Sequence, residues 1–466
     1  MNSKDERLKK SLENFVSLNA ADTSGGHKAS IYQKAFKKTH PQSKRHDKVW
    51  YVKESYSPDE PLELEVIPGE IYRYWIGNTQ PKTRLVIDGA GNRYVASEGV
   101  PGFKTFSSIM QQGGKPSDYK TLARILVSAL VLAEIDLKAD NIGDNDNGKS
   151  VKIDHDSSLW PLVLRSMSVQ NDINQTNFSY EDLDNILEPK TFKPAVWAGG
   201  LSKDIKEGLQ NNEEFRVEVY RQILRIMVYP SEILTRIQDV NAPSDLQLKT
   251  DVQQFIQERM QLLRAESLKS KEFRSFISNL DLNDCQNQFA SELNEFFSEN
   301  KAYVEEGDNL FQPMVQTIEA IKTEVGELNT AHGEELHKMG QLKTRLKLDK
   351  GNPEHLMYWQ EKVKLGGTSI NCGGIRYYVP AKIAQMMQLE VDSFASFREF
   401  KNGLDAIRRS RKDNQKPGSL FSFFGEIKDS IVRDRTTQSL YEAQDIEEVD
   451  LRELGMEETF KPQSRS

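Results

Sequence analysis

The first half of the chain mixes the apolar patterns of strands and helices. Runs rich in β-branched and aromatic residues, such as 49–52 and 85–87, are separated by Gly, Pro and Asp, as strands are by turns. The longest apolar stretch, 122–135, is interrupted by polar residues and is too short to span a bilayer, so we expect a buried helix there. These patterns together predict an α+β domain.

From about Lys203 onward the pattern becomes mainly helical. Apolar residues recur at three- and four-residue spacing before a proline breaks the run: Val217, Tyr220, Ile223, Leu224 and Met227. The spacing continues over 255–268, 289–297 and 314–348, and the last of these is long and charged enough for a helical hairpin or a coiled-coil arm. The glycine-rich stretch 366–379 interrupts the helices and is expected to form a small strand or loop insertion.

Composition narrows the range of functions. The chain has 466 residues and a formal net charge of −8, which argues against a general nucleic-acid binder. No apolar stretch predicts a transmembrane segment, and two cysteines cannot build a disulfide framework. Basic clusters at 37–48 and 408–412, the second followed by aromatic residues at 421–424, could bind an anionic membrane or an inositol phosphate. Most such clusters are solvated surface.

The clearest candidate chemistry follows the predicted buried helix. Asp136 lies five positions before Asn141, and Asp154 follows the apolar-rich 151–153. The intervening 143–148 has the composition of a hairpin turn, so the two segments can converge. Phosphoryl transfer from ATP needs a carboxylate to orient the acceptor hydroxyl, and oxygen ligands for Mg²⁺ or Mn²⁺. Asp136 is our candidate for the first role, and Asn141 and Asp154 for the second.

Basic residues and a glycine pair could contact the phosphates of ATP. Lys138, two residues after Asp136, could stabilise charge on the transferred phosphoryl group. Lys53 ends the predicted strand 49–52, where its ammonium could neutralise phosphate oxygens. Upstream, a turn-forming segment could cover the phosphates with its backbone amides, and its candidate residues are Gly25, Gly26 and Ser30.

Two further segments complete a nucleotide cleft. The segment 63–74 can form a helix that carries a carboxylate to pair with Lys53; Glu70 is our first choice and Glu65 the alternative. The strand-like 93–100 then runs into a flexible connection. This connection resembles the hinge between the lobes of a kinase, which implies that backbone groups from Glu98 to Val100 would bind adenine.

In this order the candidates resemble the protein-kinase superfamily over about 24–159. Ile153-Asp154-His155-Asp156 replaces Asp-Phe-Gly, and Glu134-Ile135-Asp136 replaces His-Arg-Asp, which is similar to the remote loops of phosphoinositide-kinase-like and HipA-like kinases and of kinase effectors injected by intracellular bacteria. No Ala-Pro-Glu motif is present, so the resemblance does not extend to an activation segment.

The resemblance implies a bilobal domain with a helical continuation. The expected parts are an N-lobe at 1–98, a C-lobe core at 99–250, a helical extension at 251–415, an aromatic and basic segment at 416–440 and an acidic tail at 441–466.

The resemblance implies an ATP- and Mg²⁺-dependent kinase that acts on a host protein. A phosphoinositide is the alternative acceptor, and an inositol phosphate bound by the cluster at 37–48 could be an activator. The altered loop after Asp154 and the large helical part leave a second alternative, an inactive pseudokinase scaffold. The glutamate-rich end resembles type IV secretion signals, so the expected location is the host cell, in its cytoplasm or at its membranes.

Overall fold

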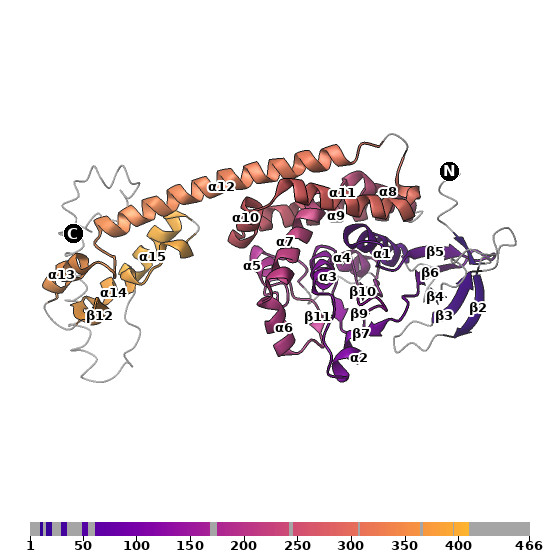
Figure 1. Ribbon diagram of the computed structural model, residues 1–466, viewed down its shortest axis with the longest axis horizontal. Helices are drawn as coiled ribbons and strands as arrows, with labels where there is room; N and C mark the ends of the chain where they lie inside the picture. Colours follow the sequence, from indigo (N-terminus) through magenta and orange to yellow (C-terminus); the bar gives the residue numbers. More distant parts are fainter. Residues whose placement is uncertain are drawn as a thin grey trace. The chain divides into compact units, whose positions relative to one another are not determined.

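The computed structural model describes residues 10–12, 15–20, 29–34, 49–54, 61–167, 175–241, 246–305, 308–363, 367–394 and 396–409. The chain divides into two compact units, Met1–Val325 and Gly326–Ser466 (Figure 1). The first unit combines sheets with helices, and the described part of the second is mainly helical. The expected α+β class with a mainly helical C-terminal region is confirmed. The finer domain boundaries stay predictions.

A mixed sheet opens the first unit. Its six strands, in the order β1-β5-β6-β4-β3-β2, are β1 (Lys10–Ser11), β2 (Phe15–Ala20), β3 (Ala29–Lys34), β4 (Val49–Glu54), β5 (Thr83–Ile87) and β6 (Arg93–Glu98). Only the β1–β5 pair is parallel among these. Because side chains alternate between faces, Trp50 and Val52 belong to one apolar cluster, whereas Val95 belongs to another that includes Val66 of the following helix.

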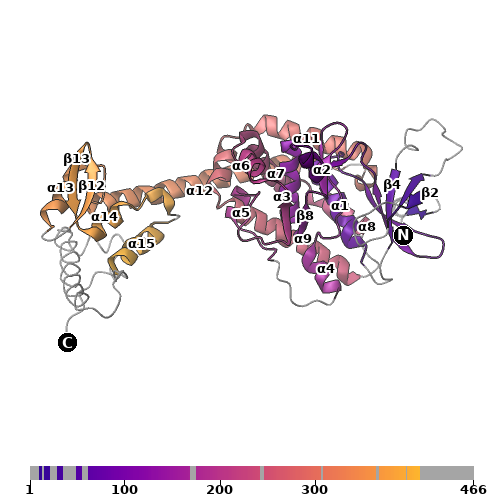
Figure 2. The same cartoon turned by 90° about the horizontal axis from the view of Figure 1, so that it is seen from below.

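That helix, α1 (Glu63–Ile76), is enclosed on every side. All of its 14 residues are buried, although it contains three glutamates and an arginine. It lies between the sheet and the helices α3 (Tyr119–Val131) and α8 (Ser231–Asn241) (Figures 1 and 2). It ends at Gly77, whose φ of +127° favours glycine. Burial on all sides requires each charged side chain of α1 to have a partner inside the protein.

Short strands follow α3 and bring the predicted loops together. The strands β9 (Ile142–Asp144) and β10 (Ser150–Lys152) form an antiparallel hairpin, as expected, and β7 (Lys104–Thr105) extends this sheet ahead of helix α2 (Phe106–Gln111). Strand β8 (Asp136–Lys138) pairs in parallel with β11 (Val196–Gly199). The predicted buried helix is α3. The side chain of Asp118 caps its N-terminus by accepting a hydrogen bond from the Thr121 amide.

The remaining helices of the first unit share one hydrophobic core with α1 and α3, which extends from Leu64 to Val325. They are α4 (Trp160–Ser166), α5 (Tyr180–Asp184), α6 (Lys203–Gln210), α7 (Glu213–Val228), α9 (Leu246–Ser267), α10 (Lys271–Ser278), α11 (Leu282–Glu299) and the 3₁₀ helix η4 (Lys301–Tyr303). Helix α12 (Phe311–Arg345) crosses into the second unit. It is one helix of 35 residues, so a hairpin in this segment is excluded.

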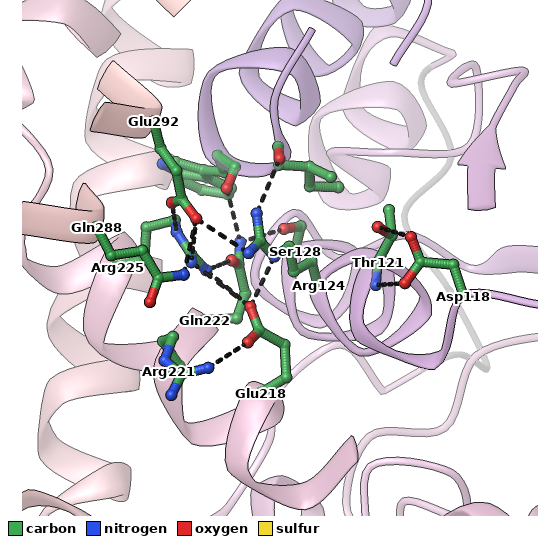
Figure 3. A network of polar contacts seen from close by, with 12 residues as sticks. Asp118, Thr121, Arg124, Ser128, Glu218, Arg221, Gln222, Arg225, Gln288 and Glu292 are labelled. Carbon is green, nitrogen blue, oxygen red and sulfur yellow. Dashed lines mark hydrogen bonds and ion pairs between the residues drawn. The ribbon is translucent and has the colours of Figure 1, made fainter. Parts of the chain in front are cut away.

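A buried polar network connects α1 to α3, α7 and α11 (Figure 3). The guanidinium of Arg225 is fully buried and donates to Glu292 at 2.7 Å, while Arg124 donates to Glu218 at 2.6 Å and to Glu292 at 3.0 Å. Arg124 also donates to the carbonyl of Ile76 at 3.2 Å, at the end of α1. These arginines hold the pKa of both glutamates below the ordinary value, against the opposing effect of burial.

The second unit has a core of its own, which includes Met339, Trp359 and Phe400. Its elements are α13 (Pro353–Glu361), β12 (Thr368–Cys372), β13 (Ile375–Val379), α14 (Ala381–Met387), the 3₁₀ helix η5 (Val391–Ser393) and α15 (Phe397–Arg409). The expected strand insertion is the β12–β13 hairpin, closed by Gly373 and Gly374 with positive φ. Within the described parts of the chain, no helix combines the length and the apolar character needed to cross a bilayer.

Candidate active site

Lys53 lies at the centre of a cluster of carboxylates. It follows Val52 on β4, and its side chain points to the face of the sheet that α1 covers. Its Nζ atom lies 2.9 Å from Oε1 of Glu65 and 2.5 Å from Oδ1 of Asp154, with Oδ2 of Asp156 at 3.9 Å. Residues from the sheet, from α1 and from the loop after β10 therefore meet at one ammonium group.

The partner of Lys53 on α1 is Glu65, so our first choice of Glu70 was wrong. Glu70 is fully buried elsewhere: it accepts hydrogen bonds from the Thr83 amide at 3.0 Å and the Tyr303 hydroxyl at 2.9 Å, and it lies 3.7 Å from Arg84. Five residues on a helix correspond to a rotation of about 140°, so the two glutamates point in different directions. Only the one that faces β4 can reach Lys53.

The charges in this cluster strongly affect one another. Burial alone would lower the pKa of Lys53, but the neighbouring carboxylates, Glu65 first, raise it above the ordinary value. Burial raises the pKa of Glu65 to about 7 despite the attraction of Lys53, and the two nearby aspartates contribute in the same direction. For Asp154, burial alone would raise the pKa, but the charge of Lys53, its hydrogen bond and the charge of Lys152 together lower the pKa to about 2. At neutral pH the cluster therefore carries more than one negative charge around a single ammonium.

Asp136 and Lys138 form a second charged pair on β8. Oδ2 of Asp136 accepts from Nζ of Lys138 at 2.7 Å, and this contact helps to raise the pKa of Lys138. Both side chains are partly exposed, at 26% and 44%. Asn141, at the end of the loop, donates from its side-chain nitrogen to the backbone carbonyl of Asp136 at 3.2 Å. The amide oxygen of Asn141 takes no part in this bond, because an oxygen accepts and does not donate.

Asn141 and Asp154 are brought to the same end of the β9–β10 hairpin. The Ile153 amide donates to the Asn141 carbonyl at 2.8 Å, so the chain segments of the two candidates are neighbours. Asp154 has a φ of +61°, a left-handed conformation that is uncommon for a residue other than glycine. Strained backbone of this kind is concentrated at functional sites, and here it directs the Asp154 carboxylate to Lys53.

The two residues after Asp154 have separate roles. His155 is buried and stacks on Tyr72 of α1 with ring centroids 4.8 Å apart; burial, with the positive charge of Lys152, holds its pKa well below the ordinary value. Asp156 lies beside Lys53 and was not among the candidates. The Asp-His-Asp run was visible in the sequence, where a second acidic residue two positions after Asp154 was the signal.

The remaining candidates for nucleotide binding come from the glycine pair, from strand β3 and from the segment that follows β6. Gly25 and Gly26 are outside the described residues. Ser30 is in strand β3 rather than in a turn, opposite Val52, so its side chain lies on the face of the sheet opposite to Lys53. The Glu98 amide donates to the Lys82 carbonyl at 2.8 Å, and the Val100 carbonyl accepts from the Phe103 amide at 3.3 Å. Adenine binding by this segment stays a prediction that depends on its other backbone groups.

No protein-family model matches the chain, and no curated protein matches it. Among solved structures, the chain is similar to the crystal structure of a Helicobacter pylori proinflammatory kinase, CtkA, with a TM-score of 0.34 and 14% sequence identity. The match covers 53% of this chain and 93% of that chain. The likeness is remote in sequence and in structure.

Proposed function

We propose that this protein is an ATP- and Mg²⁺-dependent phosphotransferase with an alcohol group as acceptor. One observation carries the proposal: Lys53 bridges Glu65 and Asp154, at 2.9 and 2.5 Å, beside the loop that holds Asp136 and Asn141. A half-buried ammonium held by carboxylates from two other elements is a costly arrangement for a fold to maintain without a use. In phosphoryl transfer it provides a fixed positive charge for the phosphates of ATP.

The partly exposed pair on β8 is suited to the acceptor side of the reaction. In the proposed reaction, Asp136 orients the acceptor hydroxyl and accepts its proton as the bond to phosphorus forms. Lys138 lies 2.7 Å from this carboxylate and can move to the transferred phosphoryl group, where charge develops. The acceptor would approach from solvent, because Lys138 keeps 44% of its side chain exposed.

The donors near Lys53 fit a hard divalent cation. The carboxylates of Asp154 and Asp156 and the amide oxygen of Asn141 are the oxygen ligands that Mg²⁺ and Mn²⁺ prefer, and Mg²⁺ is commonly held by one or two carboxylates together with phosphates of the substrate. Within the described ranges, no group of three or more carboxylate, imidazole and thiol side chains is arranged to hold an ion alone. When bound, the cation would neutralise charge on the phosphates of ATP.

Transfer of the γ-phosphoryl group of radiolabelled ATP tests the proposal. Wild-type protein should label itself, a model protein acceptor or a component of a host extract, and Asp154→Ala should reduce the rate about a thousandfold. Asp140→Ala is the matched control, because Asp140 is an exposed aspartate of the same loop. Circular dichroism should show that all three proteins are folded. Equal incorporation by the wild type and Asp154→Ala, or none by the wild type on proteins and lipids, would refute the proposal.

A protein acceptor and a role as a secreted effector are finer proposals. The effector role rests on the acidic tail, an activating inositol phosphate on the basic cluster at 37–48, and membrane binding on the cluster at 408–412 with the aromatic residues at 421–424. Apart from 408–409, these segments lie outside the described residues. A host protein is our preferred acceptor, and a phosphoinositide is the alternative. Lipid and protein acceptors offered in parallel, with and without inositol phosphate, would separate these cases, and a translocation reporter with and without 441–466 would test secretion. ATP binding without any transfer would favour the pseudokinase scaffold.

A further inference from the structure

A second ion pair, fully buried, connects the loop of Asp136 with the loop of Asp154. Nζ of Lys152 lies 3.0 Å from Oε2 of Glu134, and the two side chains are 0% and 1% exposed. Glu134 lies two residues before Asp136, and Lys152 lies two residues before Asp154. The pair therefore occupies equivalent places ahead of the two aspartates on which the proposed reaction depends.

Glu134 holds the backbone on both sides of the pair. Its Oε1 accepts from the Asp136 amide at 3.1 Å, and its Oε2 accepts from the Ser158 hydroxyl at 2.7 Å. Backbone bonds support the same connection, because the Ile135 amide donates to the carbonyl of Ser157 at 3.1 Å. The Glu134 carboxylate thus connects the start of β8 to the segment that follows Asp154.

Lys152 performs the corresponding task on the other loop. Its ammonium donates to the backbone carbonyl of Asp154 and, at 3.3 Å, to that of Ile153. It also lies over the ring of Tyr72, at 5.5 Å from the centroid, and so contacts the helix that carries Glu65. The left-handed backbone of Asp154 needs such support, because a strained conformation persists only where its surroundings hold it.

We propose that Glu134 and Lys152 are positioning residues that keep Asp136 and Asp154 at the separation required for phosphoryl transfer; this inference rests on the proposed function. A buried ion pair is a weak source of stability, because removing both charges from water offsets most of their attraction, and apolar replacements of similar shape are often tolerated. The benefit of this pair is instead geometric. Both of its members bond to the backbone of the aspartates themselves.

A double-mutant cycle separates positioning from simple stability. The proteins are wild type, Glu134→Gln, Lys152→Met and the double variant, with Lys149→Met as the control, since Lys149 is a largely exposed lysine of the same hairpin. Each single change leaves a buried group without its partner and should lower the melting temperature, whereas the double variant should recover much of that loss. We expect kcat of the folded double variant to stay about 10- to 100-fold below wild type.

Recovery of both stability and kcat in the double variant would overturn the inference, because the pair would then serve folding alone. A second measurement does not depend on transfer: the shift in melting temperature that Mg²⁺ adds to a non-hydrolysable ATP analogue. The double variant should lose most of this Mg²⁺-dependent shift, while Lys149→Met keeps it. If wild-type protein shows the shift but transfers no phosphate, only the proposed function fails. If wild-type protein shows neither, both are refuted.

Discussion

Exchanging Glu65 and Glu70 separately for glutamine should have opposite effects on stability and activity. Both glutamates are buried on α1, and they differ only in what they contact. Glu65→Gln keeps the shape of the side chain but removes the charge that faces Lys53 at 2.9 Å. Glu70→Gln places an amide against Arg84 and against the donors Thr83 and Tyr303. The first change should impair catalysis and the second should impair folding.

The expected size of the Glu65 effect follows from its pKa. Burial raises that pKa from an ordinary 4.5 to about 7, and each step of one in pKa corresponds to about 1.4 kcal/mol. Ionised Glu65 thus weakens the fold by roughly 3 kcal/mol at alkaline pH. Glutamine resembles the protonated acid and should relieve this cost. Glu70→Gln should instead cost about 3 kcal/mol, because it leaves a buried arginine without its carboxylate.

The sign of the pH dependence provides a further check. Between about pH 4.5 and 7 the folded protein retains the Glu65 proton that the unfolded chain has lost, so the contribution of this group to stability falls as pH rises. The advantage of Glu65→Gln over wild type should therefore be absent near pH 4 and complete above pH 7. Thermal unfolding followed by circular dichroism at pH 4, 6 and 8 would measure it.

Activity should follow the opposite order. We expect Glu65→Gln to lower kcat/KM for ATP about 10- to 100-fold, because Lys53 loses the partner that orients it, and Glu70→Gln to stay near wild type below its melting temperature. Steady-state transfer of labelled phosphate at 20 °C would test this. Full activity in Glu65→Gln, or a large kcat loss in folded Glu70→Gln, would show that the contacts of α1 have been assigned the wrong roles.

Three other perturbations address separate parts of the molecule. Arg225→Met should destabilise the first unit by about 3 kcal/mol, because the buried Glu218 and the half-buried Glu292 both lose the fully buried arginine. Arg221→Met, on the more exposed side of α7, should cost under about 1 kcal/mol in denaturant unfolding. Asp136→Asn should lower kcat about 10²- to 10⁴-fold with no change in melting temperature, and Asp140→Asn should leave both unchanged. Chelation of Mg²⁺ by EDTA should stop transfer while the circular dichroism spectrum stays constant; persistent transfer would rule out a required cation.

The local order of the candidate site could be predicted from the sequence, because it depends on short-range patterns. The strand that carries Lys53 has β-branched and aromatic residues, and Gly148 closes the turn between β9 and β10 with a φ of +67°. The hairpin then brings Asn141 and Asp154 to the same end. These features depend on residues within about fifteen positions of one another, where turn chemistry and alternation are informative.

The choice between glutamates could not be predicted in this way. Glu65 and Glu70 both occur in a helix that is buried all round, so no polar face indicates which of them meets the sheet. The ion pair between Glu134 and Lys152 could not be predicted either. A single charged residue in an apolar stretch gives no sign of the partner that it meets in the fold. Ser30 was predicted to lie in a turn, because Ala29 and Ser30 are small residues after a glycine pair. The structure instead begins strand β3 at Ala29. Each case depends on tertiary contacts.

Helices that follow α1 in the chain hold it in place through hydrogen bonds. The C-terminal end of α1 is bound from three directions: the Tyr74 hydroxyl donates to the Pro230 carbonyl at 3.0 Å, Gln222 donates to the Trp75 carbonyl at 3.3 Å, and Arg124 donates to that of Ile76. Because the same rigid helix carries Glu65 to Lys53, these bonds also limit where Glu65 can move. These bonds fix one end of α1 within the protein's own core, so the position of Glu65 opposite Lys53 depends on the helices that pack behind α1.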